Sequence, residues 1–190
     1  MVLTDSADVA GQLRRLRHHG MSISDLERHS ASKVLVESYP VVGFNYRLSD
    51  LQAAVGTQQV RRLPTILARR RELASVYDDA LDDVPAIRLP ARPADVEWNV
   101  QSYAVQIPGL GRNHRDDLMQ SMLDEGISTR PGVMTIHSQP PYRRKGASLA
   151  VSEKASADSL MLPLHGGLSS DDVRRVSEVL VRHLAKLDLG

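Results

Sequence analysis

The sequence predicts an α/β fold, and three features of the 190-residue chain support that class. Its 42% apolar content is enough to bury a substantial core. Segments with strand-like alternation, such as 100–107, are interspersed with amphipathic segments of helical period, such as 169–187. A proline-rich stretch over 82–99 interrupts the helical periodicity. We therefore expect two parts, residues 1–83 and residues 84–190, with a domain boundary between them.

The N-terminal part begins with a strand pattern that leads into a helix. The first five residues, MVLTD, have strand composition, and residues 7–18 place apolar side chains on one helical face. Asp5 or Ser6 stands at the N-cap position, and Gly20 follows as the expected stop. Because the backbone of a strand in a core must be paired, this opening predicts that the chain starts in the middle of a larger architecture.

A loop with a short extended piece is expected over residues 21–40, and a long helical segment follows it. Ser49 and Gln52 fit a capping box at its start. Pro64 removes one helical hydrogen bond, so we expect two helices or one kinked helix over 49–81. The run ARRRE within this segment is typical of a solvated helix surface.

The part after residue 83 predicts a small α+β domain. Its expected elements are a strand at 100–107, a helix at 112–126, a strand at 127–136 interrupted by Pro131-Gly132, a weak helix at 151–160 and a final helix at 169–187. The final helix has Ser169 or Ser170 as its cap. Its expected inward side chains are Val173, Val176, Val179, Leu180 and Leu184.

Charge and composition exclude several classes of protein. The 24 basic and 23 acidic residues nearly cancel, so we expect no nucleic-acid partner and no membrane-surface role. No stretch approaches the roughly 18 apolar residues of a membrane span, and the N-terminus does not read as a secretory signal. The chain has no cysteine, which excludes disulfides and thiolate metal ligands and fits a cytoplasmic location.

Three other patterns favour an ordinary structural interpretation. The seven histidines include no helical i, i+4 pair, so we expect no metal site. The GLGRNH segment around Gly109 lacks the third glycine and the downstream acid of a dinucleotide loop, which favours a plain turn. Ser30 and Lys33 match a Ser-x-x-Lys pattern, but so short a pattern matches easily.

The strongest local signal is VVGFNYRLSDLQAAVG, residues 41–56. The N-terminus of a helix offers unpaired amides and a partial positive charge. Asn45 adds an amide donor and Arg47 a bidentate cation, and both groups match phosphate oxygens. These residues predict a phosphate or carboxylate site, and the alternative is an exposed loop with a solvated arginine.

The segment GFNYRLSDLQAAVGTQQVRRLPTILARRRELASVYDDAL resembles the DegT/DnrJ/EryC1/StrS family of sugar aminotransferases, which depend on pyridoxal phosphate (PLP). The family pattern is Gly-aromatic-Asn-Tyr-Arg followed by Ser/Thr-Asp-x-Gln-Ala-Ala. The resemblance extends to MVLTDSADVAGQLRRLRHHGM before this segment and to GISTRPGVMTIHSQPPYR and SLMLPLHGGLSSDDVRRV after it. It implies the C-terminal part of a fold-type I transferase: the last strand and helix of the large domain, a long helix and a small α+β domain.

The resemblance also implies a cofactor, a substrate and roles for five residues. PLP is the implied cofactor, and the family reaction transfers an amino group, typically from glutamate, to a keto sugar attached to a nucleotide. Asn45 is implied to reach the cofactor phosphate of the neighbouring subunit in a homodimer, with Arg47 and Tyr46 facing the same shared site. His137 and Arg130 stand in the implied substrate-side loop, which lacks the His-Tyr pair common in the family.

The chain departs from the family at the catalytic lysine. Family members place the lysine of the internal aldimine shortly before the strand that corresponds to the first residues here. The lysines of this chain all lie downstream, at Lys33, Lys145, Lys154 and Lys186. We therefore expect no catalytic residue and no activity in this chain alone, with a separate N-terminal half as a possible partner. The alternative is a binding or dimerisation module without chemistry.

Overall fold

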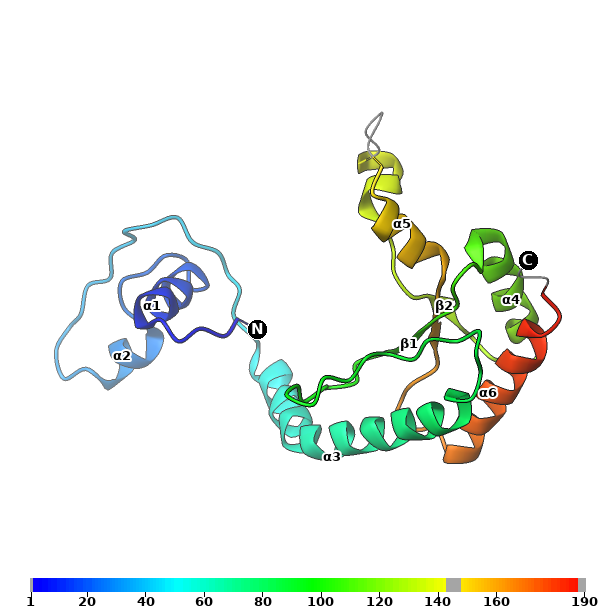
Figure 1. Cartoon of the computed structure of the whole chain (residues 1–190). Coiled ribbons are helices and arrows are strands. Elements are labelled where there is room, and N and C mark those ends of the chain that lie inside the picture. The colour runs from blue at the N-terminus through cyan, green and yellow to red at the C-terminus, as the bar shows by residue number, and fades with distance from the viewer. Residues whose placement is uncertain (1, 143–147, 188–190) are drawn as a thin grey trace. The chain divides into compact units, whose positions relative to one another are not determined.

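The structure is a computed structural model that describes residues 2–142 and 148–187. The chain divides into two compact units, Met1–Arg61 and Arg62–Gly190. The long helix α3 (Figure 1), Asp50–Leu81, contains the boundary between the two units. The domain boundary expected after residue 83 stays a prediction. Within the described residues, no helix is both long and apolar enough to cross a membrane.

The first unit contains helix α1, Ala7–Leu16, and the six-residue helix α2, Asp25–Ser30. Ser6 caps α1, as the sequence predicts, because its hydroxyl accepts a first-turn amide. Ser24 and Glu27 form a reciprocal capping box at the start of α2. The sequence predicted only a loop where α2 lies, because six residues are too few to show a helical period.

The prediction of a strand at the N-terminus is wrong. Residues 2–4 have no strand conformation and no ladder partner among the described residues. Strand composition describes side chains that suit a sheet, whereas a strand also needs a neighbouring backbone to pair with.

Helix α3 is one continuous helix of 32 residues with Pro64 inside it, so the single-helix alternative is confirmed. The arginines of the ARRRE run are not simply solvated, contrary to expectation. Their guanidinium groups donate to backbone carbonyls as follows: Arg69 to Leu168 at 2.5 Å, Arg70 to Gln101 at 2.8 Å and Arg71 to Trp98 at 3.1 Å. They therefore fasten α3 to two loops of the second unit.

The second unit contains a three-stranded antiparallel sheet with the order β1-β3-β2. Its strands are β1 (Tyr103–Gln106), β2 (Arg130–Pro131) and β3 (Ser159–Leu162). The predicted strands at β1 and β2 are present, although β2 is much shorter than expected. The central strand β3 was missed, because its four residues SLML are nearly all buried and show no alternation.

Three helices accompany this sheet: α4 (Gly111–Asp124), α5 (Ala150–Ala157) and α6 (Ser170–Leu184). Figure 1 shows α4 and α6 side by side, and the two helices are in contact. Ser169 and Asp172 cap α6 reciprocally. All five apolar residues predicted to face inward from α6 are buried, so that prediction is confirmed.

The core of the molecule lies in the second unit. It combines the C-terminal half of α3 with the sheet, α4 and α6. Its largest fully buried side chains are Tyr77, Tyr103, Leu73, Leu81, Ile107, Leu110, Leu118, Met122, Leu160 and Leu180. Two short 3-10 turns, η1 (Ile136–Ser138) and η2 (Pro140–Tyr142), follow β2 outside this core. They occupy part of the region that was expected to continue as a strand and loop.

Candidate functional site

The loop predicted to bind the cofactor phosphate, residues 43–47, is hydrogen-bonded to the end of α1. The Phe44 amide donates to the last carbonyl of α1 at 2.7 Å, and the Phe44 carbonyl accepts from the His19 amide at 3.0 Å. The Tyr46 amide donates to the Arg17 carbonyl at 3.0 Å. The backbone of the loop is therefore held by Leu16, the last residue of α1, and by Arg17 and His19, which follow it.

Two glycines allow this close approach. Gly20 has a positive φ of 76°, and a Cβ there would lie 1.9 Å from the Val41 carbonyl oxygen. A Cβ at Gly43 would lie 2.0 Å from the Gly20 amide nitrogen. Because the atoms in the way are backbone, neither position accepts a side chain without moving the loop.

Asn45 and Arg47 contact each other on this loop. The Arg47 Nε donates to Asn45 Oδ1 at 3.1 Å, and both residues are exposed. Since the amide oxygen accepts this bond, the Asn45 Nδ2 group remains the donor suited to a phosphate oxygen. The rings of Phe44 and Tyr46 stack beside them with centroids 5.1 Å apart.

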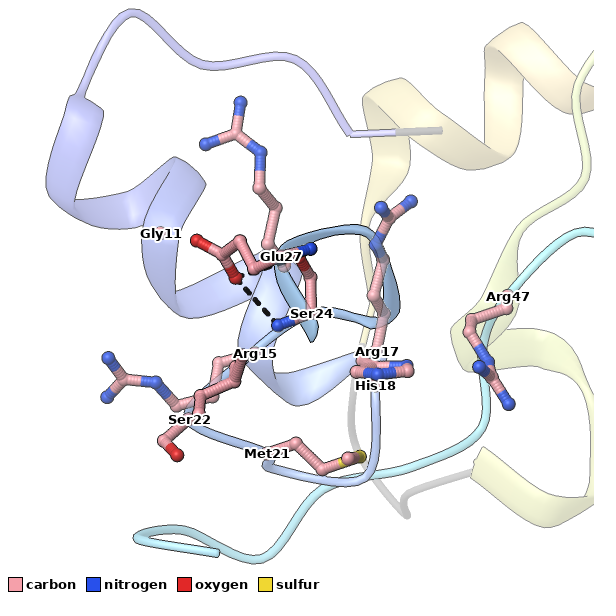
Figure 2. Close-up of a pocket in the computed structure, with 11 residues that line it drawn as sticks. Gly11, Arg15, Arg17, His18, Met21, Ser22, Ser24, Glu27 and Arg47 are labelled. Carbon is pink, nitrogen blue, oxygen red and sulfur yellow. Dashed lines mark hydrogen bonds between the residues drawn. The ribbon is translucent and has the colours of Figure 1, made fainter. Parts of the chain in front are cut away.

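A pocket of about 440 Å³ lies in the first unit and is strongly basic (Figure 2). Its cationic lining residues are Arg14, Arg15, Arg17 and Arg47, and His18 adds an imidazole. The acidic lining residue in the described part is Glu27, whose carboxylate accepts from the Ser24 amide and hydroxyl at 2.7 Å each. These bonds, the backbone one first, hold the pKa of Glu27 below its ordinary value. The pocket thus has four guanidinium groups and one carboxylate, which is already hydrogen-bonded to Ser24. This lining is suited to binding an anion.

The start of α3 offers less to an anion than the sequence indicates. The Ser49 hydroxyl accepts from the Gln52 amide at 3.3 Å, and the Gln52 side chain accepts from the Ser49 amide at 3.0 Å. The predicted capping box is confirmed, and it occupies one of the amides expected for the anion. Asp50 adds a carboxylate to the same turn.

The three predicted cofactor residues have different positions relative to the pocket. Arg47 lines it, whereas Asn45 and Tyr46 belong to the same loop but are not among its lining residues. The structure therefore brings Arg47 together with arginines of α1. The role of these residues toward the cofactor of a neighbouring subunit stays a prediction.

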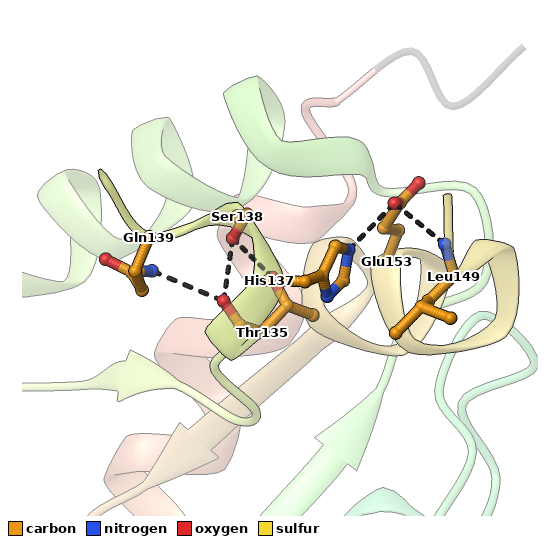
Figure 3. A network of polar contacts seen from close by, with 6 residues as sticks. All are labelled: Thr135, His137, Ser138, Gln139, Leu149 and Glu153. Atoms are coloured by element: carbon orange, nitrogen blue, oxygen red, sulfur yellow. Dashed lines mark hydrogen bonds and ion pairs between the residues drawn. The ribbon is translucent and has the colours of Figure 1, made fainter. Parts of the chain in front are cut away.

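The two predicted substrate residues lie in the second unit. Arg130 is exposed on β2, opposite Met161 of β3. His137 lies in the turn η1, and its Nε2 is 2.9 Å from the Glu153 Oε1 of α5 (Figure 3). Bonds from His137 and from the Leu149 amide hold the pKa of Glu153 below its ordinary value.

No lysine of the described residues has the surroundings of a buried catalytic amine. Lys33 is exposed in a bend, Lys186 is exposed after α6, and Lys154 pairs with Asp158 at 2.8 Å. Lys145 lies outside the described residues. Within the same parts of the chain, no group of three or more His, Asp or Glu side chains gathers around a metal-sized space.

The sequence analysis did not identify two sets of residues at these sites. The arginines of α1 are visible as the run RRLR, but that run by itself does not show that it meets Arg47. Glu153 lies 16 residues from His137 in a segment with only a weak helical pattern, so no sequence signal links the two.

Comparison with known proteins identifies the chain's relatives. The sequence profile of the DegT/DnrJ/EryC1/StrS aminotransferase family matches residues 1–181. A dTDP-4-dehydro-2,3,6-trideoxy-D-glucose 4-aminotransferase of Saccharopolyspora spinosa is 34% identical over 176 residues, which are 90% of this chain and 44% of that protein. The chain thus spans about half the length of the curated relative it matches.

Solved structures show the same relationship. The aminotransferase TlmJ of Streptoalloteichus hindustanus matches with a TM-score of 0.79 and 30% identity, over 96% of this chain and 46% of TlmJ. The PLP form of Spr1654 from Streptococcus pneumoniae matches with a TM-score of 0.80 and 20% identity, over 96% and 45% of the two chains. The fold is part of a fold-type I transferase, and the chain belongs to the DegT/DnrJ/EryC1/StrS aminotransferase family.

Proposed function

We propose that this chain is the C-terminal part of a PLP-dependent aminotransferase that transfers an amino group from glutamate to a nucleotide-linked keto sugar. The observation that carries the proposal is the family match over residues 1–181, combined with an Asn45–Arg47 pair next to an arginine-lined pocket. We place the reaction in the cytoplasm and in the biosynthesis of sugars for polysaccharides or secondary metabolites.

The residues present fit one part of the cofactor. An asparagine amide and a guanidinium are donors that match the oxygens of a phosphate group. Asn45 and Arg47 provide both on one exposed loop, whose backbone α1 holds in place. In the proposed homodimer Asn45 holds the cofactor phosphate of the neighbouring subunit, and Arg47 and Tyr46 face the same shared site. PLP, when bound, supplies the electron sink for the amino transfer.

The substrate side lies on the second unit. His137 presents an imidazole that is mostly buried, with 16% of its side chain exposed, and Arg130 presents an exposed cation. An imidazole can exchange hydrogen bonds with a sugar hydroxyl, and a guanidinium suits the diphosphate of a nucleotide sugar. We assign both residues to binding the nucleotide sugar.

We propose that none of this chain's lysines holds the cofactor. Lys33 is exposed, and Lys154 is occupied by Asp158. A nucleophilic lysine is usually desolvated or lies next to another cation, and neither Lys33 nor Lys154 has such surroundings. We therefore propose that the chain is inactive alone and works together with a lysine-bearing N-terminal half.

A chimeric subunit tests the proposed function. The chain replaces the 44% of the Saccharopolyspora spinosa relative that it matches. In this proposal the rest of that relative contributes the lysine. We expect the chimera to transaminate that relative's keto sugar and the 190-residue chain alone to be inactive. Borohydride reduction should fix PLP to a lysine of the donated half.

Two results of this experiment would contradict the proposal. A chimera that folds and holds PLP but transfers no amino group would favour the alternative, a binding or dimerisation module without chemistry. Selective reduction of PLP onto Lys33 in the chain alone would show that the chain has its own cofactor lysine.

A further inference from the structure

We propose that Glu153 is a positioning residue that fixes the ring of His137 and leaves its Nδ1 to accept a hydrogen bond from a sugar hydroxyl. This inference deepens the proposed function and rests on it, because it assigns His137 to the sugar. Glu153 lies on α5, outside the loop that carries the histidine.

The first support is the contact between the two side chains. His137 Nε2 and Glu153 Oε1 are 2.9 Å apart. The same Oε1 also accepts the Leu149 amide, at 3.1 Å, at the start of α5 (Figure 3). The acceptor oxygen is therefore fixed by the backbone of α5, and it defines one position for the imidazole nitrogen.

Helix α5 holds the same loop at a second point. The Ser156 hydroxyl donates to the Val133 carbonyl at 2.8 Å, and Ser156 is three residues after Glu153 on the same helical face. The Ser156 carbonyl accepts from the buried Arg115 of α4 at 2.6 Å. The surface that orients His137 is thus anchored to the core of the second unit.

The backbone beneath His137 is fixed as well. The Thr135 side chain is buried, and its hydroxyl lies 2.6 Å from the Ser138 hydroxyl, which also donates to the Thr135 carbonyl at 2.7 Å. These bonds close the turn η1 around His137. With the turn and Nε2 both held, the ring has little freedom left.

The chemistry of the pair decides which nitrogen serves a ligand. A carboxylate only accepts hydrogen bonds, so Nε2 carries the proton that points to Glu153. The Nδ1 of a neutral imidazole is then an acceptor. Among the described residues no hydrogen bond reaches Nδ1, and a sugar hydroxyl has the donor that it lacks.

Nuclear magnetic resonance of the full 190-residue chain tests the positioning without cofactor or substrate. Ring N–H protons exchange quickly in exposed histidines and slowly when a carboxylate accepts them. We expect one slowly exchanging proton on Nε2 of His137, assigned by its loss in His137→Gln. Glu153→Ala should abolish this signal, whereas Glu153→Gln should preserve it, because the amide oxygen still accepts.

The chain contains its own control. The Nε2 of His183, a residue of α6, contacts the Glu125 Oε1 at 2.6 Å, a pair that does not include Glu153, so its ring proton should survive every Glu153 substitution. If Glu153→Ala also abolished the His183 signal, the variant would be unfolded. The positioning role would then be judged from the wild-type spectrum alone. A His137 proton found on Nδ1, or no protected ring proton in the folded wild type, would overturn the positioning role.

The chimera gives the functional arm of this test. Glu153→Ala should raise KM for the nucleotide sugar by roughly tenfold, and Glu153→Gln should restore most of the affinity. An unchanged KM in Glu153→Ala would overturn the assignment to the sugar. A parent chimera without activity would instead count against the proposed function. The His137 ring resonance of the 190-residue chain would still test whether Glu153 positions that ring.

Discussion

At the scale of single residues, Glu125 joins the end of α4 to α6. Its carboxylate contacts the Arg182 guanidinium and lies 2.6 Å from His183 Nε2, and its carbonyl accepts from Arg175 at 2.8 Å. The bond from His183, followed by that from Arg182, holds the pKa of Glu125 below its ordinary value. One acidic side chain therefore links two core helices electrostatically.

This pairing predicts a pH-dependent effect of Glu125→Gln. A carboxylate with a lowered pKa in the folded state stabilises that state above its ordinary pKa, and the contribution is lost as the pH falls through the lowered value. Thermal melts should show a lower Tm for the variant at about pH 5 and a difference that shrinks toward about pH 3. Glu178→Gln, on the exposed side of α6, is the matched control. A difference that stays constant with pH would show that the charge of Glu125 is unimportant.

The residue scale also shows how far the sequence predicts the candidate site. Asn45 and Arg47 follow from a local motif, because their contact spans two positions along one loop. The pairing of His137 with Glu153 spans 16 positions and depends on where α5 lies. The sequence therefore predicts which residues are chemically suited, and the fold decides which of them meet.

At the scale of secondary structure, helices were predicted better than strands. The caps Ser6, Ser49 and Ser169 are local patterns, and all three make the expected contacts. A strand depends on partners elsewhere in the chain, which is why the four residues of β3 were missed although they occupy the centre of the sheet. The N-terminal segment shows the reverse case, in which strand composition has no partner.

The two serine caps at Ser169 and Ser6 predict unequal effects on stability. The Ser169 hydroxyl accepts the Asp172 amide at 3.1 Å, so Ser169→Ala should cost about 1 kcal/mol of unfolding free energy. Helix α6 buries six residues, five of them apolar, whereas α1 buries none, so Ser6→Ala should leave the main transition unchanged. Denaturant titration of both variants checks this. Equal shifts would mean that α1 unfolds cooperatively with the core.

At the scale of the whole molecule, the two units differ in how much they bury. The hydrophobic core lies entirely between Leu73 and Leu184. The first unit exposes large apolar side chains, among them Val34, Val36, Val42, Phe44, Tyr46, Leu48, Leu51, Val55 and Val60. Large exposed apolar patches are typical of interaction surfaces. The exposed set includes residues of the Asn45 loop, which agrees with our proposal that this loop serves a neighbouring subunit.

That proposal predicts a specific loss in the chimera described above. If Asn45 donates to the cofactor phosphate, Asn45→Ala removes a hydrogen bond to a charged group, worth about 1.5–3 kcal/mol. Affinity for PLP should then fall by roughly ten- to a hundredfold. Titration of the apo-chimera with PLP measures this loss, and Asn99→Ala, at an exposed asparagine far along the chain, is the matched control.

Hybrid dimers decide which subunit Asn45 serves. An Asn45→Ala subunit is mixed with a subunit whose lysine in the donated half is replaced, so that only the hybrid pairs an intact lysine site with an intact loop from its neighbour. In the proposed homodimer each parent would be defective at both sites, because each site would combine the lysine of one subunit with the loop of its neighbour. Recovery of a fraction of the parent chimera's activity on mixing is the expected result. If the hybrid is as inactive as the Asn45→Ala and lysine variants, with subunit exchange confirmed, then Asn45 acts within its own chain.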